Sequence, residues 1–231
     1  MYKKEDASYR VGDLPEEQSV AGSSKAMLAA KKAFENYEEP KELKVFLTER
    51  LRRAKINYNK ILHEVEKALV YRALKKHPRM NSTLDGDTIT RHAEVHMGVA
   101  VALPEGLVVP VLHNADDMGL LRIASEARLL AGRARKGGLT PDDMSGGTFT
   151  ITNMAHAVVE CLTPILKPGE TGILGLGRVT EKPVVRNGAI VVRSMMGLSL
   201  TFDHRVEDGA PAAEFLKTLT EFLAEPALLL F

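Results

Sequence analysis

The segment Leu198–Gly209 reads LSLTFDHRVEDG, an alternating apolar strand that leads into a histidine flanked by acidic residues and then into the start of a helix. Histidine has the unperturbed side-chain pKa closest to neutral pH, so His204 at the end of a strand can accept and return a proton. Asp208 has an alternative role, because an aspartate before a helix that begins at Gly209 can cap its first turn, which also tolerates Pro211. The segment therefore predicts a strand, a loop with a candidate general base, and a helix.

The rest of the hydrophobic pattern predicts helices and strands in an irregular order. Helical patterns cover Lys25–Phe34, Leu43–Arg53, a segment from Asn57 or Asn59 to His77-Pro78, Leu120–Arg135 and Ala210–Ala224. Strand patterns cover a hairpin over Val95–Leu112 and the segments Thr148–Thr152, Ile173–Leu176, Val184–Val185, Ile190–Arg193 and Gly197–Phe202. Hairpins without repeated strand–helix–strand units indicate an α+β fold with a mixed, largely antiparallel sheet.

Composition excludes several classes of function. The 231 residues, 45% of them hydrophobic, suit one large domain, and a net charge of +1 argues against nucleic-acid binding. The single cysteine, Cys161, excludes an intrachain disulfide and favours a reducing compartment. Its apolar neighbours predict a small core residue rather than a nucleophile. The chain has no signal-peptide pattern and no membrane-spanning apolar run, so we expect a cytoplasmic protein, or a mitochondrial matrix protein if the source is eukaryotic.

Three motifs occur in the order and spacing of one known family. DHRVEDG at 203–209 is followed by Ala212, Ala213, Phe215 and Leu216; GGTFTITN lies at 146–153; and VAVA, GLVVPV and NAD lie between 99 and 116. Together they resemble the catalytic core of the dihydrolipoamide acyltransferases of 2-oxo acid dehydrogenase complexes, relatives of chloramphenicol acetyltransferase. The resemblance extends from Lys55 to the C-terminus. It implies a chloramphenicol-acetyltransferase-like fold, in which helices pack on a mixed sheet.

The resemblance also implies a reaction, the transfer of an acyl group between coenzyme A and the thiol of dihydrolipoamide. His204 is then the general base, Thr152 donates to the oxyanion where the family usually has serine, and Asp208 orients the histidine region. The 52 residues from Thr152 to His204 match the family's interval. Asn153 and Phe202 are expected to contact substrate. The resemblance assigns no residues to coenzyme A binding, and no histidine of the chain has metal-ligand spacing.

The expected partners follow from the same resemblance. In the family the histidine and the hydroxyl come from different subunits of a homotrimer. Residues 1–24 are expected to form an N-terminal arm and residues 25–231 the catalytic core, without a lipoyl or dehydrogenase-binding domain. The lipoyl group is therefore expected on another domain or chain, with decarboxylase/dehydrogenase and dihydrolipoamide dehydrogenase subunits as further partners. The apolar C-terminus Pro226–Phe231 either docks trimers into a cubic or dodecahedral core or packs on the chain's own last helix.

Two departures from the family pattern leave alternative functions open. The N-terminal quarter lacks the family's usual helix start, and Ala155-His156 replaces a continuation that normally contains glycine. These departures are compatible with a non-catalytic core subunit. A stand-alone coenzyme A-dependent acetyltransferase for a small hydroxylated acceptor is a further alternative, although Asp203 stands where that branch usually has a second histidine. The flanking Asp203 and Arg205 are expected to pair structurally with other segments rather than to act in the chemistry. The sequence does not select the acyl group.

Overall fold

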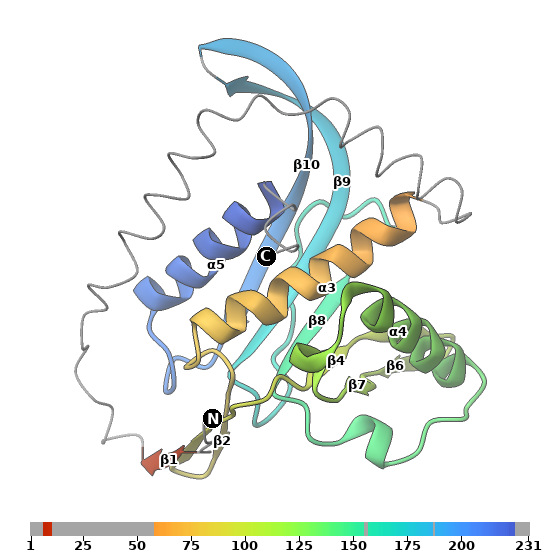
Figure 1. Cartoon of the computed structure of the whole chain (residues 1–231), viewed down its shortest axis with the longest axis vertical. Helices are drawn as coiled ribbons and strands as arrows, with labels where there is room; N and C mark the ends of the chain where they lie inside the picture. The colour runs from red at the N-terminus through yellow and green to blue at the C-terminus, as the bar shows by residue number, and fades with distance from the viewer. Residues whose placement is uncertain (1–6, 11–57, 155–156, 187, 225–231) are drawn as a thin grey trace. The chain divides into compact units, whose positions relative to one another are not determined.

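The described part of the chain comprises residues 7–10, 58–154, 157–186 and 188–224 of a computed structural model (Figure 1). The chain divides into two units, Met1–Gly12 with Glu64–Phe231, and Asp13–His63. The first unit contains the sheets and the candidate site. The helices predicted over 25–34 and 43–53 and the C-terminal segment 226–231 lie outside the described residues.

The main sheet has five strands in the order β10-β9-β8-β4-β7. The strands are β4 (Met97–Val99), β7 (Val111–Leu112), β8 (Phe149–Asn153), β9 (Gly172–Arg186) and β10 (Ala189–Phe202). The pairs β4–β8 and β8–β9 are parallel, whereas β4–β7 and β9–β10 are antiparallel. The mixed sheet predicted from the sequence is therefore confirmed.

Two smaller sheets accompany the main one. β5 (Val101–Leu103) and β6 (Gly106–Val108) form the tip of the hairpin that the sequence predicted between β4 and β7. β1 (Ala7–Arg10), β3 (Thr88–Arg91) and β2 (Ser82–Asp85) form an antiparallel sheet in that order, with β1 at an edge. The β2–β3 hairpin was not predicted. Gly86 at its turn has a φ of 56°, a left-handed conformation that glycine adopts without strain.

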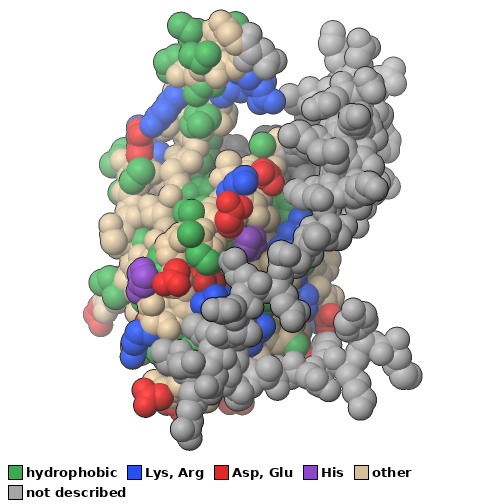
Figure 2. Space-filling model, turned by 90° about the vertical axis from the view of Figure 1, so that its left-hand side faces the viewer, with side chains coloured by type: hydrophobic (Ala, Val, Ile, Leu, Met, Phe, Trp, Pro, Cys, Tyr) green, Lys and Arg blue, Asp and Glu red, His purple; other side chains and the backbone are tan. Residues whose placement is uncertain are grey.

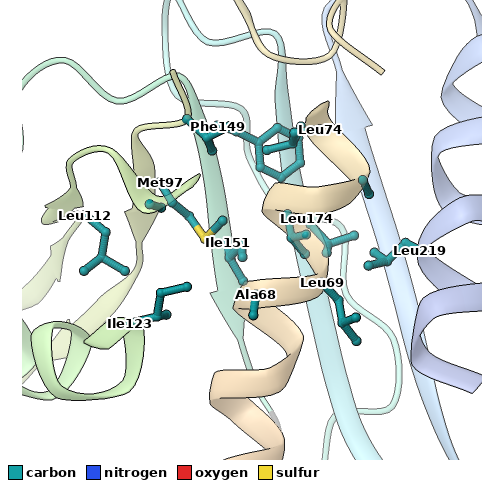
Figure 3. Close-up of a cluster of buried hydrophobic side chains, with 14 of the residues drawn as sticks. Ala68, Leu69, Leu74, Met97, Leu112, Ile123, Phe149, Ile151, Leu174 and Leu219 are labelled. Atoms are coloured by element: carbon teal, nitrogen blue, oxygen red, sulfur yellow. The ribbon is translucent and has the colours of Figure 1, made fainter. Parts of the chain in front are cut away.

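Three helices, α3 (Tyr58–Lys76), α4 (Leu120–Arg135) and α5 (Gly209–Ala224), match predicted ranges closely and pack on the sheet (Figure 1). Side chains alternate along each strand, so Phe149 and Ile151 of β8 and Leu174 of β9 face the helices. Figure 3 shows them in one layer with Ala68, Leu69 and Leu74 of α3, with Leu219 of α5 beside that layer. The same alternation turns Thr150 and Thr152 to the opposite face. Short 3-10 helices also occur at Ala115–Asp117 and Asp142–Met144.

The opposite face of the sheet is crossed by the segment 157–167. The amide of Arg178 donates to the carbonyl of Val159 (2.8 Å), and the hydroxyl of Thr201 donates to the carbonyl of Pro164 (2.8 Å). A Cβ atom at Gly177 would collide with the backbone carbonyl of Glu160. The sheet therefore needs glycine where this segment crosses it most closely.

Two features of this region correct the sequence predictions. The short strands predicted over 173–176, 184–185, 190–193 and 197–202 are parts of two long strands, β9 and β10, because Pro183 remains paired and the irregularity between Met196 and Leu198 shifts the register without ending either strand. Cys161 is exposed rather than a core residue, because it lies on the segment that crosses the sheet over Gly197, outside the cluster of buried side chains. Within the described residues, no helix is long and apolar enough to span a membrane.

Candidate active site

The loop between β10 and α5 is a tight turn with a fixed backbone. The amide of Asp203 donates to the carbonyl of Thr171 (2.9 Å), the residue before β9. The amides of Val206 and Glu207 both donate to the carbonyl of Asp203, at 3.0 and 3.1 Å. The side chains of Val206 and Glu207 are buried beneath the turn, whereas His204 is exposed on its outer side.

His204 and Asp208 form the exposed pair at this turn. His204 Nδ1 lies 3.5 Å from Asp208 Oδ1, and the two side chains are 72% and 70% exposed. A carboxylate facing Nδ1 favours the tautomer with its proton on Nδ1, which leaves Nε2 free to accept a proton from a substrate. The rings of Phe202 and His204 are 5.6 Å apart, centroid to centroid. The structure thus brings together three of the predicted site residues, His204, Asp208 and Phe202.

Asp203 and Arg205 pair with each other across His204. Arg205 donates through Nε and Nη2 to the two carboxylate oxygens of Asp203, at 3.0 and 2.6 Å. The hydrogen bonds from Arg205 and its charge hold the pKa of Asp203 below its ordinary value. This corrects the expectation that they pair with other segments, because the two opposite charges lie within reach of each other in the same turn. Their pairing stabilises the turn on either side of the histidine.

Arg79 and Glu207 form a second ion pair, which the sequence analysis did not identify. Arg79 Nε lies 3.3 Å from Glu207 Oε1, and Arg79 Nη2 donates to the carbonyl of Val206 (3.2 Å). Burial raises the pKa of Glu207, and the positive charge of Arg79 opposes this shift. The only available sequence signal was an acidic residue next to the apolar Val206. Its partner precedes it by more than a hundred residues, so the pairing could not be found without the fold.

Thr152 lies on β8, far from His204 of the same chain. It pairs with Gly175 of β9, which pairs in turn with Ser199 of β10. The end of β10 at Phe202 lies three residues beyond Ser199, which gives roughly 10 Å along the strand and a further ~10 Å across two strand spacings. Hydroxyl and imidazole of one chain are therefore well beyond hydrogen-bonding reach of each other.

The end of β8 carries the other predicted contact residue. Asn153 pairs with Leu176 of β9, and strand alternation directs its side chain to the face opposite to that of Thr152. The amide of Met154 donates to the carbonyl of Leu176 (2.9 Å), which continues the strand by one hydrogen bond. The altered dipeptide at 155–156 lies outside the described residues. Strand pairing therefore holds the backbone from Thr152, the candidate oxyanion donor, to Met154, the residue before that dipeptide.

The other histidines with described side chains take part in local structure. His77 Nε2 hydrogen-bonds to the hydroxyl of Thr218 (2.8 Å), and burial lowers the pKa of His77. His96 Nδ1 accepts the amide of Asn114 (3.0 Å). Among the described residues, no three His, Cys, Asp or Glu side chains are grouped to hold a metal ion.

A hollow of about 270 Å³ lies away from the histidine loop, beside the end of α3 and β3. It is lined by Leu74, Lys75, Pro78, Asn81, Arg91, His92 and Ala93. Neither His204 nor Thr152 contributes to it, so it is separate from the candidate catalytic groups.

Comparisons with known proteins place the sequence among acyltransferases. Residues 25–231 match a family model described as the catalytic domain of 2-oxoacid dehydrogenases acyltransferase. The dihydrolipoyllysine-residue acetyltransferase component of the acetoin cleaving system of Bacillus subtilis is 46% identical over 170 residues. That alignment covers 74% of this chain and 42% of the relative, so the chain spans about two fifths of the relative's length.

Two solved structures are similar over nearly the whole chain. The first is the dihydrolipoamide acetyltransferase of Azotobacter vinelandii, studied for the role of a serine, a histidine and an asparagine in its catalytic mechanism. It is 32% identical with a TM-score of 0.73, and the match covers 95% of each chain. The second is the cubic core of the pyruvate dehydrogenase multienzyme complex, 33% identical with a TM-score of 0.73 and the same coverage.

Proposed function

Because the chain belongs to the family of 2-oxoacid dehydrogenase acyltransferase catalytic domains, as its motifs predicted, we propose that it transfers an acyl group between coenzyme A and the thiol of dihydrolipoamide. The observation that carries the proposal is the spacing of Thr152, His204 and Asp208. In the Azotobacter vinelandii enzyme, the serine, histidine and asparagine studied for their catalytic role have the same separations, 52 and four residues. The pairing of His204 with Asp208 supports the same assignment.

In this proposal His204 is the general base. Its Nε2 takes the proton of the acceptor thiol, and the thiolate attacks the carbonyl carbon of the donor thioester. Thr152 donates its hydroxyl proton in a hydrogen bond to the oxyanion of the tetrahedral intermediate. The intermediate then collapses, so that one C–S bond has formed and one has broken, and the leaving thiolate recovers the proton from His204.

Asp208 takes the position of the relative's asparagine and carries a negative charge. It holds the Nδ1 proton of His204 and stabilises the imidazolium that exists while the base carries the thiol proton. Because both side chains are exposed in one copy of the chain, solvent screens this attraction. A neighbouring copy that covers the loop strengthens it by excluding water.

We also propose that the site lies between two copies of the chain, with His204 from one and Thr152 from its neighbour. Within one copy the strand register separates the two residues by more than about 10 Å, which supports a shared site. A homotrimer, the assembly implied by the family resemblance, repeats this junction three times around a closed ring.

The outer part of the β9–β10 hairpin supports contact with another copy. Val185, Ile190 and Val192 are 75%, 78% and 67% exposed. Figure 2 shows hydrophobic side chains together with basic ones at the upper end of the view, where the hairpin tip projects in Figure 1. A two-stranded ribbon is marginally stable alone in water, so it gains from a partner that covers these side chains.

The wider assembly is part of the same proposal. The similarity to the cubic core of the pyruvate dehydrogenase multienzyme complex supports a role as a core of such an assembly. The lipoyl group then arrives on another domain or chain, between the decarboxylase/dehydrogenase and dihydrolipoamide dehydrogenase subunits. The single cysteine agrees with a reducing compartment, the cytoplasm or, in a eukaryote, the mitochondrial matrix.

Thioester exchange tests the reaction. The purified chain is incubated with dihydrolipoamide and acetyl-, succinyl- or branched-chain acyl-coenzyme A, and the acylated product is measured. We expect exchange with at least one donor and a loss of about 10²- to 10⁴-fold in His204→Ala. No exchange with any donor, from a protein that assembles normally, would favour a non-catalytic core subunit.

Mixing two inactive variants tests the shared site. His204→Ala and Thr152→Val are refolded together, so that a site regains both groups only when the two variants are neighbours in the correct order. Random mixing in a ring predicts that about one quarter of the sites become active. Each variant refolded alone is the control. No recovery in assembled mixtures would place both groups in one subunit, contrary to the proposal.

A further inference from the structure

The histidine loop is held from beneath by a residue that is distant in sequence. Arg79, between α3 and β2, donates from Nη2 to the carbonyl of Val206, and its Nε lies 3.3 Å from Glu207 Oε1. The same carboxylate oxygen accepts the amide of Asp208 (3.2 Å). Arg79 thus contacts the loop directly at the carbonyl of Val206. Through Glu207 it also acts on the backbone amide of Asp208, whose side chain faces His204.

We propose that Arg79 and Glu207 are positioning residues, which hold the backbone of residues 206–208 so that His204 and Asp208 keep their catalytic geometry. The inference rests on the proposed acyl transfer, because it assigns the pair a part in that reaction. Neither residue touches the reacting atoms. Each acts through the loop.

The exposure of the catalytic pair is the first reason for this assignment. The side chains of His204 and Asp208 are largely in solvent, so in one copy their separation of 3.5 Å depends on where the backbone places them. Glu207 is only 3% exposed and Arg79 is 28% exposed, so their contact is shielded. A displacement of about 1 Å in a catalytic group costs up to ~10²-fold in rate, which makes such an anchor consequential.

The charges around Glu207 give the second reason. The groups that act on its carboxylate are Arg79 from the α3–β2 connection, Arg91 from β3 and Asp208 from its own loop. A buried ion pair is weak evidence for stability, because desolvation offsets much of the attraction. The placement of the guanidinium is nevertheless specific, because Nη2 donates to the carbonyl of Val206 while Nε lies beside the Glu207 carboxylate without a hydrogen bond to it. A lysine ammonium does not occupy both positions at once.

The test separates positioning from stability by removing the ion pair in two ways. Glu207→Leu leaves the arginine without its carboxylate, whereas Arg79→Met/Glu207→Leu replaces both partners by apolar side chains. Arg79→Lys keeps the charge and loses the planar geometry. The matched control is Glu214→Gln, which removes the carboxylate of the exposed Lys217–Glu214 pair on α5. The full chain is used in each case.

Three quantities are measured: melting temperature, amide hydrogen exchange of the peptide over 203–209, and the kcat and KM of acyl exchange. We expect Glu207→Leu to melt earlier, to exchange faster in that peptide, and to lose about 10- to 100-fold in kcat with little change in KM. The double variant recovers the melting temperature but neither the protection nor kcat. Arg79→Lys falls between wild type and Glu207→Leu, and Glu214→Gln matches wild type.

Two outcomes would overturn the proposal. The first is an unchanged exchange rate in the 203–209 peptide of Glu207→Leu, since the loop would then not depend on the pair. The second is a kcat of the double variant that recovers together with its melting temperature, as expected for a purely stabilising pair. A wild-type chain without acyl exchange would count against the proposed function, and hydrogen exchange would still decide whether the pair holds the loop.

Discussion

The two halves of the β9–β10 hairpin have opposite surroundings. In the inner half, residues 172–177 are buried, and 172–176 pair with 198–202, with helices on one face and the 157–167 segment on the other. In the outer half, residues 179–186 and 189–196 are mostly exposed (Figure 1). A register irregularity between Met196 and Leu198 marks the boundary. The same two strands are thus buried in the core at one end and form a solvent-exposed two-stranded ribbon at the other.

This difference indicates which parts of the candidate site are held by contacts within one chain and which lie next to an exposed surface. His204 follows the inner end of β10, where the loop is anchored by contacts within the chain. Thr152 pairs with Gly175, close to the boundary with the uncovered ribbon. The oxyanion candidate therefore lies next to the surface that we propose another copy covers. In this proposal the loop of His204 is held by contacts within its own subunit, whereas Thr152 lies next to the interface with another copy.

The largest loss of stability is expected from a substitution in the inner half, at Gly177. A Cβ atom there would strike the backbone of Glu160, which cannot move without displacing the crossing segment. We expect Gly177→Ala to lower the free energy of unfolding by about 3 kcal/mol or more, measured by denaturant titration. Gly132→Ala in α4 is the control, because no atom lies within 4 Å of its new Cβ. This substitution should stabilise the helix by about 0.5–1 kcal/mol. Equal effects of the two substitutions would contradict the close crossing at Gly177.

The sequence predicted α4 and α5 well because their apolar spacing and terminal glycines are local signals. It divided β9 into short strands because Gly177 and Pro183 resemble breaks when read locally. The reason for Gly177 is the segment 157–167, whose path over the sheet depends on tertiary packing. The two-residue turn Gly86-Asp87 between β2 and β3 is, by contrast, a local signal for a hairpin.

The candidate site also combines features that local sequence signals predict with features that depend on tertiary structure. Motif spacing identified His204, Asp208 and Thr152, and the resemblance supplied their expected roles. No local pattern could place Thr152 and His204 at different ends of the inner half, because that requires the strand register. The support from Arg79 also depends on tertiary structure. Sequence thus identified candidate groups for the chemistry, whereas their separation and their anchoring required the fold.

Thr152→Val tests the donor beside the boundary and should have the next largest effect. It removes the hydroxyl and keeps the branched shape, so we expect kcat of acyl exchange to fall about 10²- to 10³-fold. Thr152→Ser, which keeps the donor, should remain within about tenfold of wild type. Steady-state kinetics with the best acyl donor measure both. A fully active Thr152→Val would remove this residue from the proposed mechanism.

A charged substitution in the outer half should weaken assembly and spare the inner half. Ile190 and Val192 lie two residues apart on β10, so they share one face of the ribbon. We expect Ile190→Lys/Val192→Lys to raise the dissociation constant between copies about 5- to 30-fold, because the ammonium groups would have to be desolvated. Sedimentation velocity across a concentration series measures this change. Hydrogen exchange in 172–177 should match that of wild type when both proteins are compared as monomers. An unchanged dissociation constant would assign the ribbon to another role.

The smallest expected effect is a change in the free energy of unfolding with pH. It distinguishes the carboxylates of Glu207 and Asp203, both in the loop that follows the inner half. The pKa of Glu207 is raised above its ordinary 4.5 by burial, so its contribution to stability is present below that pH and is lost as the pH rises through the raised value. The pKa of Asp203 is lowered from 3.8, so its contribution is present above that pH and is lost as the pH falls through the lowered value. Glutamine and asparagine do not titrate. The free energy of unfolding of Glu207→Gln should therefore improve relative to wild type as the pH rises from 4 to 7.

Asp203→Asn gives the matched contrast with the opposite sign. Its free energy of unfolding relative to wild type should improve as the pH falls below about 4, because the wild-type protein then loses the Arg205 pairing. Denaturant titrations of both variants and wild type at each pH measure the differences, in which titrating groups common to all three proteins cancel. Parallel pH profiles for the two variants would mean that Glu207 is not desolvated beneath the loop. The ionised carboxylate would then cost little to keep, and the case that it is retained for geometry rather than stability would lose its basis.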